Sequence, residues 1–359
     1  MKVLLVAGAR PNFIKIAPLV AAMDAHGGFV RELVHTGQHF DDSMSAVFFA
    51  ELGIPRPDHD LKVGSGSHAR QTAEIMSRFE PVLRRSAPDV VVVVGDVNST
   101  LACALTAAKE GIPVAHVEAG LRSFDRRMPE ELNRMVTDAL SDLLFVSEPA
   151  GVTNLLREGL GDRGIHLVGN VMIDTLRRFR EAARERQVAR RLGLVARQYA
   201  VVTLHRPSNV DDPEVLGGIL RALGRISAEV PVILPAHPRA RGILMAAGAE
   251  WPGLRVIEPL GYLDFLDLIS DAMVAITDSG GVQEETTVLG VPCLTVRENT
   301  ERPITIEQGS NRLVGTDALR IIAEFERVRK GEVAQGRVPD LWDGGAARRI
   351  VEVLASREV

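Results

Sequence analysis

The sequence is poor in cysteine and in aromatic residues, and it has no excess of basic charge. Among its 359 residues only Cys103 and Cys293 are cysteines, which excludes a disulfide framework and a metal site of CxxC type. Each lies in an apolar run, which predicts a reduced core residue of the kind usual in cytosolic proteins. The formal net charge of −5 offers no basic face for nucleic acid.

Long hydrophobic runs are also absent, so no stretch reaches the length of a membrane span. The opening run, MKVLLVAG, is followed by no signal-peptide cleavage pattern. We therefore expect a cytoplasmic protein that binds neither membrane nor nucleic acid. Aromatic residues make up only 4% of the chain, so the core must rest on Val, Leu, Ile and Ala. The length suits two domains of common size.

Short β-branched runs are present, and they alternate with stretches whose apolar residues recur about every 3.6 positions, as in 13–23 and 71–79. This alternation is typical of a parallel sheet covered by helices on both faces. Five consecutive valines at 90–94 predict a central strand. The first series of predicted strands lies at 3–6, 33–36, 90–94, 114–117, 143–146 and 167–168.

The alternation pauses after Gly169, where we expect one long charged helix from Asp174 to about Arg191. It then restarts, with predicted strands at 200–204, 232–234, 256–257, 274–277, 294–296 and 313–314. Two such series predict an α/β fold of two Rossmann-like, doubly wound domains facing a central cleft. We expect an N-terminal domain at 1–169 and a C-terminal domain at 170–343, with a last helix within 344–359 that packs back on the first domain.

Ligands of open parallel sheets bind beyond the carboxyl ends of the strands, so the loops there are the candidate sites. The first loop, 8–12, contains Arg10 and is followed by Lys15 one helical turn later. A helix N-terminus with two cations is suited to an anion, although a plain turn with solvated charges fits the same residues. The loop is neither a GxGxxG nor a Walker A motif, so it signals neither a dinucleotide nor a nucleoside triphosphate.

Three carboxylates follow strands of the first series, namely Asp96, Glu118 and Glu130. Asp96 would also serve as a helix N-cap, and Glu130 is favoured by the dipole of the helix that it begins. Glu118 lies between an apolar strand and a glycine turn, where bulk solvent is poorly accessible. Grouped carboxylates favour proton transfer, because like charges and burial raise at least one pKa.

Two histidines, His205 and His237, directly follow strands of the second series. Each is placed for phosphate contact or proton transfer, and each would equally be a solvated or core-edge histidine. His35 and His39 are four residues apart but lack the HExxH helix of a zinc site, so we expect no metal. No GxSxG elbow is present, which disfavours a serine hydrolase.

The segment Thr277–Glu285 is the strongest local signal, because a strand ends, two glycines follow and a helix begins. Ser279, Gly280 and Gly281 predict a backbone nest and helix N-terminus suited to a pyrophosphate, the alternative being an ordinary glycine-rich turn. We expect Glu285 on the first helical turn, accepting hydrogen bonds from ribose hydroxyls. Further cations follow at Arg302 and Arg312.

In their order along the chain these segments resemble the non-hydrolysing UDP-N-acetylglucosamine 2-epimerase family, and the resemblance covers nearly the whole chain. The segments that carry it are GARPNFIKIAPLV, TGQH, GD, HVEAGLRS, PEELNR, GN, HRP, DSGGVQEE, ERP and NRLVG. The resemblance implies the glycosyltransferase-B architecture and a homodimer. It also implies inversion of carbon 2 of UDP-N-acetylglucosamine without cofactor or metal, by elimination of UDP to a 2-acetamidoglucal intermediate and its re-addition.

The resemblance further implies roles for individual residues. The catalytic positions are Asp96, Glu118, Glu130 and His205, and the substrate-binding positions are Arg10, Lys15, Ser279, Gly280, Gly281, Glu285, Arg302 and, as a weaker match, Arg312. Two departures stand out. Ala9 replaces the usual threonine of the first loop, and the stretch 205–208 reads HRPS where many bacterial members read HRRE. That stretch helps bind an activating second substrate molecule in those members, and relatives with HRP act on modified sugars such as 2,3-diacetamido uronates.

Three other functions remain open from the sequence. A hydrolysing 2-epimerase would release UDP and free N-acetylmannosamine. A glycosyltransferase of the same architecture would share the pyrophosphate site but would not need three carboxylates in its first domain. A catalytically inactive sugar-nucleotide sensor would bind without turnover.

Overall fold

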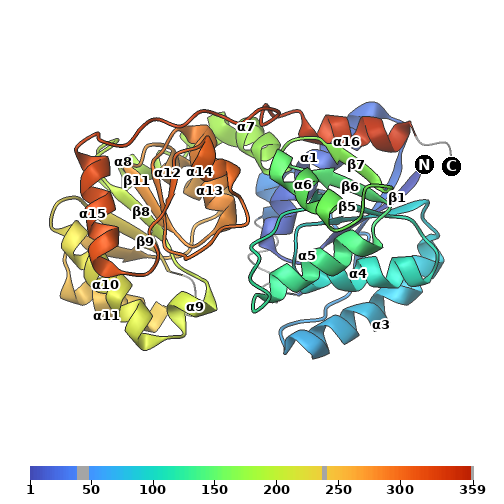
Figure 1. Ribbon diagram of the computed structural model, residues 1–359, viewed down its shortest axis with the longest axis horizontal. Coiled ribbons are helices and arrows are strands. Elements are labelled where there is room, and N and C mark those ends of the chain that lie inside the picture. Colours follow the sequence, from blue (N-terminus) through green and yellow to red (C-terminus); the bar gives the residue numbers. More distant parts are fainter. Residues whose placement is uncertain (39–47, 237–240, 357–359) are drawn as a thin grey trace. The chain divides into compact units, whose positions relative to one another are not determined.

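The computed structural model describes residues 1–38, 48–236 and 241–356, and the chain divides into two compact units (Figure 1). Unit 1 comprises Met1–Arg177 and Asp340–Val359, and unit 2 comprises Arg178–Pro339. The sequence alone suggests a first boundary at 169. The division falls later because the helix that starts at Val171 is bonded to the returning chain: Asp174 accepts hydrogen bonds from the backbone N–H groups of Ala346 and Ala347.

Unit 1 contains a seven-stranded sheet in the order β3-β2-β1-β4-β5-β6-β7. Every strand pair in it is parallel, as the apolar runs predict. The five-valine strand is the fourth of the seven and fully buried, so its predicted central place is confirmed. The strands are β1 (Lys2–Ala7), β2 (Val30–His35), β3 (His59–Asp60), β4 (Val90–Val94), β5 (Val114–Ala119), β6 (Leu143–Val146) and β7 (Gly164–Leu167). The two-residue strand β3 carries no apolar run and is missing from the sequence prediction.

Helices cover both faces of this sheet. On one face the side chains of Leu4 and Val91 pack against α3 and α4. Figure 1 shows α1 and α16 together on the opposite side, where the two helices contact each other. The helices are α1 (Arg10–His26), α3 (His68–Ser86), α4 (Asn98–Lys109), α5 (Pro129–Leu140), α6 (Pro149–Arg157), α7 (Val171–Arg184) and α16 (Ala346–Ala355).

Unit 2 repeats the same architecture with a six-stranded parallel sheet in the order β10-β9-β8-β11-β12-β13. Its aliphatic core joins the strands to α10 and α15. The strands are β8 (Ala200–Thr203), β9 (Val232–Pro235), β10 (Leu254–Ile257), β11 (Val274–Thr277), β12 (Cys293–Thr295) and β13 (Asn311–Leu313). The helices are α8 (Val188–Arg191), α9 (Pro207–Val210), α10 (Pro213–Ser227), α11 (Arg241–Glu250), α12 (Tyr262–Ser270), α13 (Gly280–Leu289), α14 (Ile304–Glu307) and α15 (Ala318–Arg329).

The single charged helix expected from Asp174 to about Arg191 is wrong. The chain forms α7 and α8 instead, separated by residues 185–187, the last of which, Gln187, lies in the left-handed region with φ 49°. A buried carboxylate fixes the restart, because Asp267 accepts a hydrogen bond of 2.6 Å from the backbone N–H of Val188. The composition that favours helix throughout this stretch is therefore overridden by a tertiary contact.

The order of the strands reverses once in each sheet, between β1 and β4 in unit 1 and between β8 and β11 in unit 2. At such a switch point the connections leave in opposite directions, so the carboxyl ends of the two strands open a crevice for ligands. The loops at 8–12 and 95–98 lie at the first switch point, and those at 204–208 and 278–281 lie at the second.

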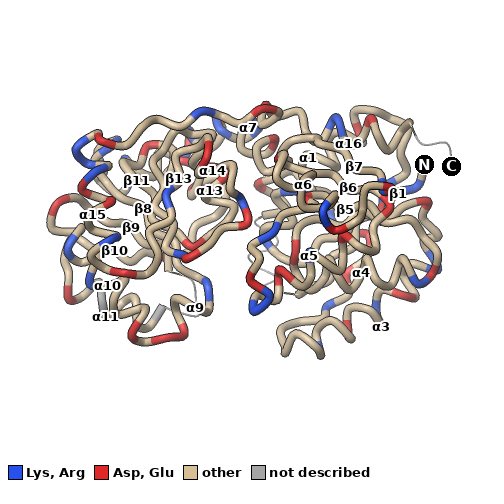
Figure 2. Tube along the Cα trace, in the orientation of Figure 1, with Lys and Arg blue, Asp and Glu red and all other residues tan. Residues whose placement is uncertain are grey.

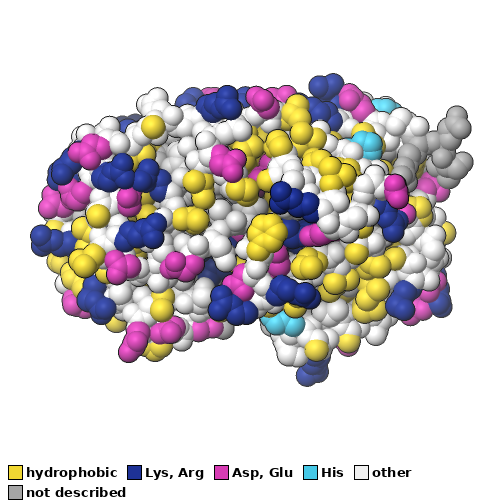
Figure 3. All heavy atoms as spheres, viewed as in Figure 1, with side chains coloured by type: hydrophobic (Ala, Val, Ile, Leu, Met, Phe, Trp, Pro, Cys, Tyr) yellow, Lys and Arg dark blue, Asp and Glu magenta, His cyan; other side chains and the backbone are white. Residues whose placement is uncertain are grey.

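The surface carries charges of both signs without a large patch of one sign on the face shown. Acidic and basic residues are spread over both units (Figure 2), and they are interspersed with apolar side chains in the space-filling view (Figure 3). Within the described part of the chain, no helix combines the length and hydropathy needed to cross a membrane.

Candidate active site

The loop after β1 is closed by its own asparagine. The backbone N–H groups of Gly8 and Ala9 both donate to Asn12 Oδ1 at 3.0 Å, and Asn12 Nδ2 donates to the carbonyl of Val94. This ties the loop to the end of β4, across the switch point. Arg10 lies with its guanidinium carbon 5.6 Å from the centre of the Phe48 ring. The loop is therefore rigid, with two of its amides already satisfied.

Asp96 follows β4 and is held from two sides by α5. Its carboxylate pairs with Arg134 at 2.5 Å, and its backbone carbonyl accepts a hydrogen bond of 2.9 Å from Asn133 Nδ2. The N-cap of α4 is Val97, without a side-chain bond, so the alternative role of Asp96 as a helix cap does not hold. The Asp96 side chain keeps 22% of its surface exposed, whereas Arg134 is almost fully buried. The partly exposed carboxylate of Asp96 thus lies against the buried guanidinium group of Arg134.

Glu118 is the penultimate residue of β5 and has a backbone conformation that is rare for residues with a side chain. Its φ is 76°, and the pairing of β5 with β6 shifts between Val117 and Ala119. A left-handed non-glycine residue at a strand bulge costs free energy and is found mostly where function requires it. The buried Glu118 carboxylate lies 2.5 Å from Lys15 Nζ, which is equally buried. Lys15 is therefore a neighbour of the candidate acid–base group, beyond its expected part in anion binding.

Glu130 and Glu131 both lie in the first turn of α5, as predicted, but they differ in burial. Glu131 is buried and accepts hydrogen bonds from the backbone N–H groups of Ser123 and Phe124 and from Arg134. Burial raises the pKa of Glu131, but these donors outweigh it and leave the pKa below its ordinary value. Glu131 thus fixes the loop before α5, and the partly exposed Glu130 remains the candidate for chemistry.

In unit 2, His205 follows β8 and is oriented by a carboxylate with no exposed surface. Its Nδ1 lies 2.7 Å from Oδ1 of Asp278, which also accepts hydrogen bonds from the backbone N–H groups of His205 and Arg206. Burial raises the pKa of Asp278, but His205 and these amides outweigh it and hold the pKa below its ordinary range. An ionised Asp278 makes Nδ1 the donor. The His205 side chain is 44% exposed, so Nε2 is the ring atom left for a substrate.

The predicted nest before α13 is wrong in detail. Gly280 and Gly281 are the first two residues of the helix, and neither has a positive φ. The amides offered here are therefore those of a helix N-terminus, with Ser279 as N-cap. Gly280 is required by close approach, because a Cβ there would lie 2.3 Å from Arg302 Nη1. Arg302 in turn donates to Glu284 at 2.7 Å and pairs with Glu301.

Glu285 is the sixth residue of α13, not part of its first turn as expected. It is buried and accepts a hydrogen bond of 3.1 Å from the Tyr262 hydroxyl. Burial raises the pKa of Glu285 to about 7, although the bond from Tyr262 acts in the opposite direction. A buried carboxylate with a single strong donor retains acceptor capacity for further hydroxyl groups.

Several other predicted positions lie apart from these groups. Arg312 of β13 is bonded to Glu324 of α15, with Nε 2.6 Å from the carboxylate, so its charge is directed to that helix. His237 and His39 lie outside the described residues. Among the residues that are described, no three or more His, Cys, Asp and Glu side chains are grouped to hold a metal ion.

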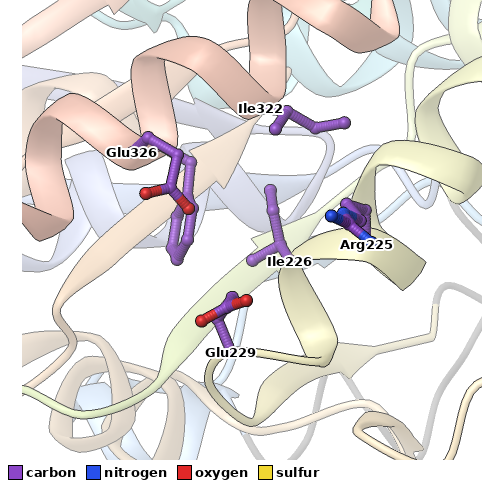
Figure 4. A pocket seen from close by; sticks show the side chains of 6 residues that line it. Arg225, Ile226, Glu229, Ile322 and Glu326 are labelled. Carbon is purple, nitrogen blue, oxygen red and sulfur yellow. The ribbon is translucent and has the colours of Figure 1, made fainter.

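A shallow hollow of about 200 Å³ lies between α10 and α15 (Figure 4). Its walls include Arg225, Glu229 and Glu326. Arg225 lies in the last turn of α10, Glu229 follows the end of that helix, and Glu326 lies in the later part of α15. The chain after α10 leads into the amino end of β9. The hollow therefore lies away from the carboxyl ends of the strands.

The family model described as UDP-N-acetylglucosamine 2-epimerase matches residues 21–355. The chain belongs to this family. The chain is 40% identical to the UDP-N-acetylglucosamine 2-epimerase of Methanococcus maripaludis, over 98% of both chains. It is 42% identical to the UDP-2,3-diacetamido-2,3-dideoxy-D-glucuronate 2-epimerase of Pseudomonas aeruginosa, over 99% of both.

A solved structure supports the same assignment. The UDP-GlcNAc 2-epimerase of Methanocaldococcus jannaschii, crystallised with UDP-GlcNAc and UDP, matches with a TM-score of 0.92 and 40% identity. The match covers 99% of this chain and all of the other. The fold is thus the predicted glycosyltransferase-B type, built from two parallel-sheet α/β domains.

Three residues beside the predicted site were not identified from sequence, namely Arg134, Asp278 and Tyr262. Arg134 and Asp278 lie inside the quoted segments PEELNR and DSGGVQEE, but nothing in their spacing says which groups they contact. Tyr262 is one of only two tyrosines, which is the one signal that points to it. A buried tyrosine hydroxyl needs a hydrogen-bond partner, and here that partner is Glu285.

Proposed function

We propose that this member of the 2-epimerase family inverts carbon 2 of UDP-N-acetylglucosamine to give UDP-N-acetylmannosamine. The reaction eliminates UDP, forms a 2-acetamidoglucal intermediate and re-adds UDP with proton return on the opposite face. Beyond the family match, one observation carries the proposal. At the switch point of unit 1, two carboxylates from neighbouring strand ends are each paired with a buried cation, Asp96 with Arg134 and Glu118 with Lys15.

The groups of unit 1 are proposed to handle the proton of carbon 2. A base removes it and an acid returns it from the other face, so at least two ionisable groups are required. Asp96, Glu118 and Glu130 are the proposed set. Lys15 and Arg134 place a positive charge against the carboxylates that they contact, Glu118 and Asp96.

The groups of unit 2 are proposed to hold the nucleotide. The N-terminus of α13, with Ser279 as N-cap and Gly280 and Gly281 in its first turn, suits the pyrophosphate, and Glu285 suits the ribose hydroxyls. Charge that develops on the departing UDP is stabilised by fixed donors, for which His205 is a candidate through Nε2. Arg10, Arg302 and Arg312 remain predicted substrate-binding residues.

The experiment is incubation of the purified protein with UDP-N-acetylglucosamine alone, followed by chromatographic separation of the products. The proposal predicts UDP-N-acetylmannosamine at equilibrium with the substrate, with at most traces of free sugar. UDP with free N-acetylmannosamine would identify a hydrolysing enzyme. UDP release only on addition of an acceptor would identify a glycosyltransferase, and binding without turnover would identify a sensor.

A modified sugar is the second candidate substrate. The identity of 42% to the Pseudomonas aeruginosa diacetamido-glucuronate epimerase slightly exceeds that to the archaeal relative, and the HRP sequence at 205–207 resembles that of enzymes acting on such sugars. The same assay with the 2,3-diacetamido uronate decides between the two. A kcat/KM at least tenfold higher for the uronate would make it the substrate.

We propose further that the enzyme acts as a cytoplasmic homodimer, as the family resemblance suggests. The free, buried cysteines Cys103 and Cys293 support this location. Light scattering on the eluting protein tests the oligomer, since a dimer predicts twice the chain mass of 38.9 kDa.

A further inference from the structure

Strand β5 carries a histidine with no exposed surface, His116, two residues before Glu118. Its Nδ1 lies 2.6 Å from Oδ1 of Asp138 on α5, and its Nε2 lies 2.8 Å from the carbonyl oxygen of Gly95 after β4. A carbonyl oxygen only accepts hydrogen bonds, and an ionised carboxylate does the same. Both ring nitrogens therefore donate, and His116 is an imidazolium ion paired with Asp138.

Asp138 is surrounded by donors that keep it ionised. Its second oxygen lies 2.7 Å from Arg122 Nη2 and accepts a hydrogen bond of 3.1 Å from the backbone N–H of Gly120. Burial alone raises the pKa of Asp138, but His116 and Arg122 outweigh it, and the pKa lies below its ordinary value. Arg122 also donates hydrogen bonds from Nε and Nη2 to the two carboxylate oxygens of Glu158. The pair is thus a fully satisfied buried network.

This pair contacts each chain segment that carries a proposed catalytic carboxylate. His116 holds the carbonyl of Gly95, the residue directly before Asp96. Asp138 holds the amide of Gly120, two residues after Glu118. Asp138 also lies on α5, whose first turn contains Glu130. Between these contacts the backbone of Glu118 is strained, since it has a φ of 76°.

We propose that the His116–Asp138 ion pair is a positioning unit that sets the backbone segments of Asp96, Glu118 and Glu130 relative to one another. This inference rests on the proposed function and assigns it two residues that do not touch the substrate. The His116 ring binds the end of β4 at Gly95 and, through Asp138, helix α5 and the turn at Gly120 after β5. These bonds fix the separation of the three segments, and proton transfer is steeply sensitive to such distances. A pair that only stabilised the core would affect folding and leave turnover intact.

The test is the double variant His116→Gln with Asp138→Asn. Replacing both partners leaves no unpaired charge at this position, so the variant is expected to fold, and Arg122 keeps Glu158. The measured quantities are kcat and KM for UDP-N-acetylglucosamine and the Kd of UDP. The matched control is His59→Gln, because His59 also pairs with a carboxylate, Glu32 at 2.9 Å, but in the β2–β3 region and without a contact to these loops.

The proposal predicts that kcat of the double variant falls at least about tenfold while KM and the UDP Kd change less than about threefold, as expected when geometry and not binding is lost. His59→Gln should leave all three unchanged. Full kcat in the double variant, or a loss confined to KM, would overturn the proposal. If the double variant does not fold, Asp138→Glu, which shifts the carboxylate by one methylene and keeps its charge, must show the same loss of kcat. An inactive parent protein would refute the proposed function instead.

Discussion

His205 owes its orientation to one buried side chain, Asp278, which binds the ring nitrogen and two backbone amides at once. Asp278→Asn replaces an obligatory acceptor by an amide that presents either a donor or an acceptor. We expect kcat to fall about 10- to 100-fold, within the usual range for acid–base and electrostatic groups, together with a loss of stability from the weakened bonds to the two backbone amides.

The matched control for this change is Asp267→Asn in the same unit, because Asp267 also accepts a backbone N–H bond, from Val188. The control should lose stability and keep kcat. Equal kcat values for both variants would show that Asp278 does not act through His205.

Glu285 predicts a pH dependence of stability. Its pKa in the fold is about 7 against an ordinary 4.5, so ionising it in the folded state costs free energy that accumulates as pH rises from about 4.5 to about 7. Glu285→Gln removes this cost. The variant should match the parent in free energy of unfolding, measured with urea, at pH 4. At pH 8 it should exceed the parent by up to roughly 3 kcal/mol, at about 1.4 kcal/mol per pKa unit.

Glu181→Gln is the control for this comparison, since the Glu181 side chain is 79% exposed. This change should leave the difference in unfolding free energy between the two pH values as it is in the parent. A Glu285→Gln protein that is less stable than the parent at pH 8 would contradict the raised pKa.

Helix α5 holds a disproportionate share of the candidate site. Along one helix, Glu130 is a proposed catalytic residue, Asn133 and Arg134 hold Asp96, and Asp138 holds His116. The sequence predicts the helix start and the candidate Glu130, because proline and two glutamates mark a first turn. It does not predict that the later turns of α5 bind residues of β5 and of the loop after β4, since contacts 22 or more residues apart leave no periodic signal.

Strand placement was predictable for a physical reason. Strands buried on both faces of a parallel sheet must be apolar throughout, and all twelve apolar runs identified from sequence correspond to strands. The failures have the opposite cause. The two-residue β3 buries too little to leave an apolar run, the break at Gln187 depends on Asp267, and the first turn of α13 starts earlier than its glycines suggest.

Helix α16 depends on a cap supplied by another helix. Asp174 of α7 accepts bonds from Ala346 and Ala347, whose amides are otherwise unsatisfied at the start of α16. Asp174→Ala should therefore destabilise unit 1 by about 0.5–2 kcal/mol. The two tryptophans report on the units separately, because Trp342 lies in unit 1 and Trp251 in unit 2.

Urea unfolding in Trp251→Phe and Trp342→Phe backgrounds measures the effect. The midpoint reported by Trp342 should fall and that reported by Trp251 should not. Arg348→Ala is the control. It removes an exposed ion pair with Glu352, and such pairs contribute little to stability, so neither midpoint should change. An equal fall in both signals would contradict a cap effect confined to unit 1.

For the whole molecule the account assigns different tasks to the two units. Asp96→Asn in unit 1 should lower kcat at least about 100-fold and leave the UDP Kd within about twofold. Glu285→Ala in unit 2 should instead weaken UDP binding at least about tenfold, through the lost bonds to ribose. Calorimetric titration with UDP measures both, and an unchanged Kd in Glu285→Ala would remove this residue from the nucleotide site.

The most direct test of the account is proton NMR of the purified protein with UDP-N-acetylglucosamine in heavy water. Elimination and re-addition through an intermediate that lacks the carbon 2 proton predicts the manno epimer with deuterium at carbon 2. Epimer formation that retains the original proton at carbon 2, or no exchange and no epimer with either UDP-sugar, would contradict it.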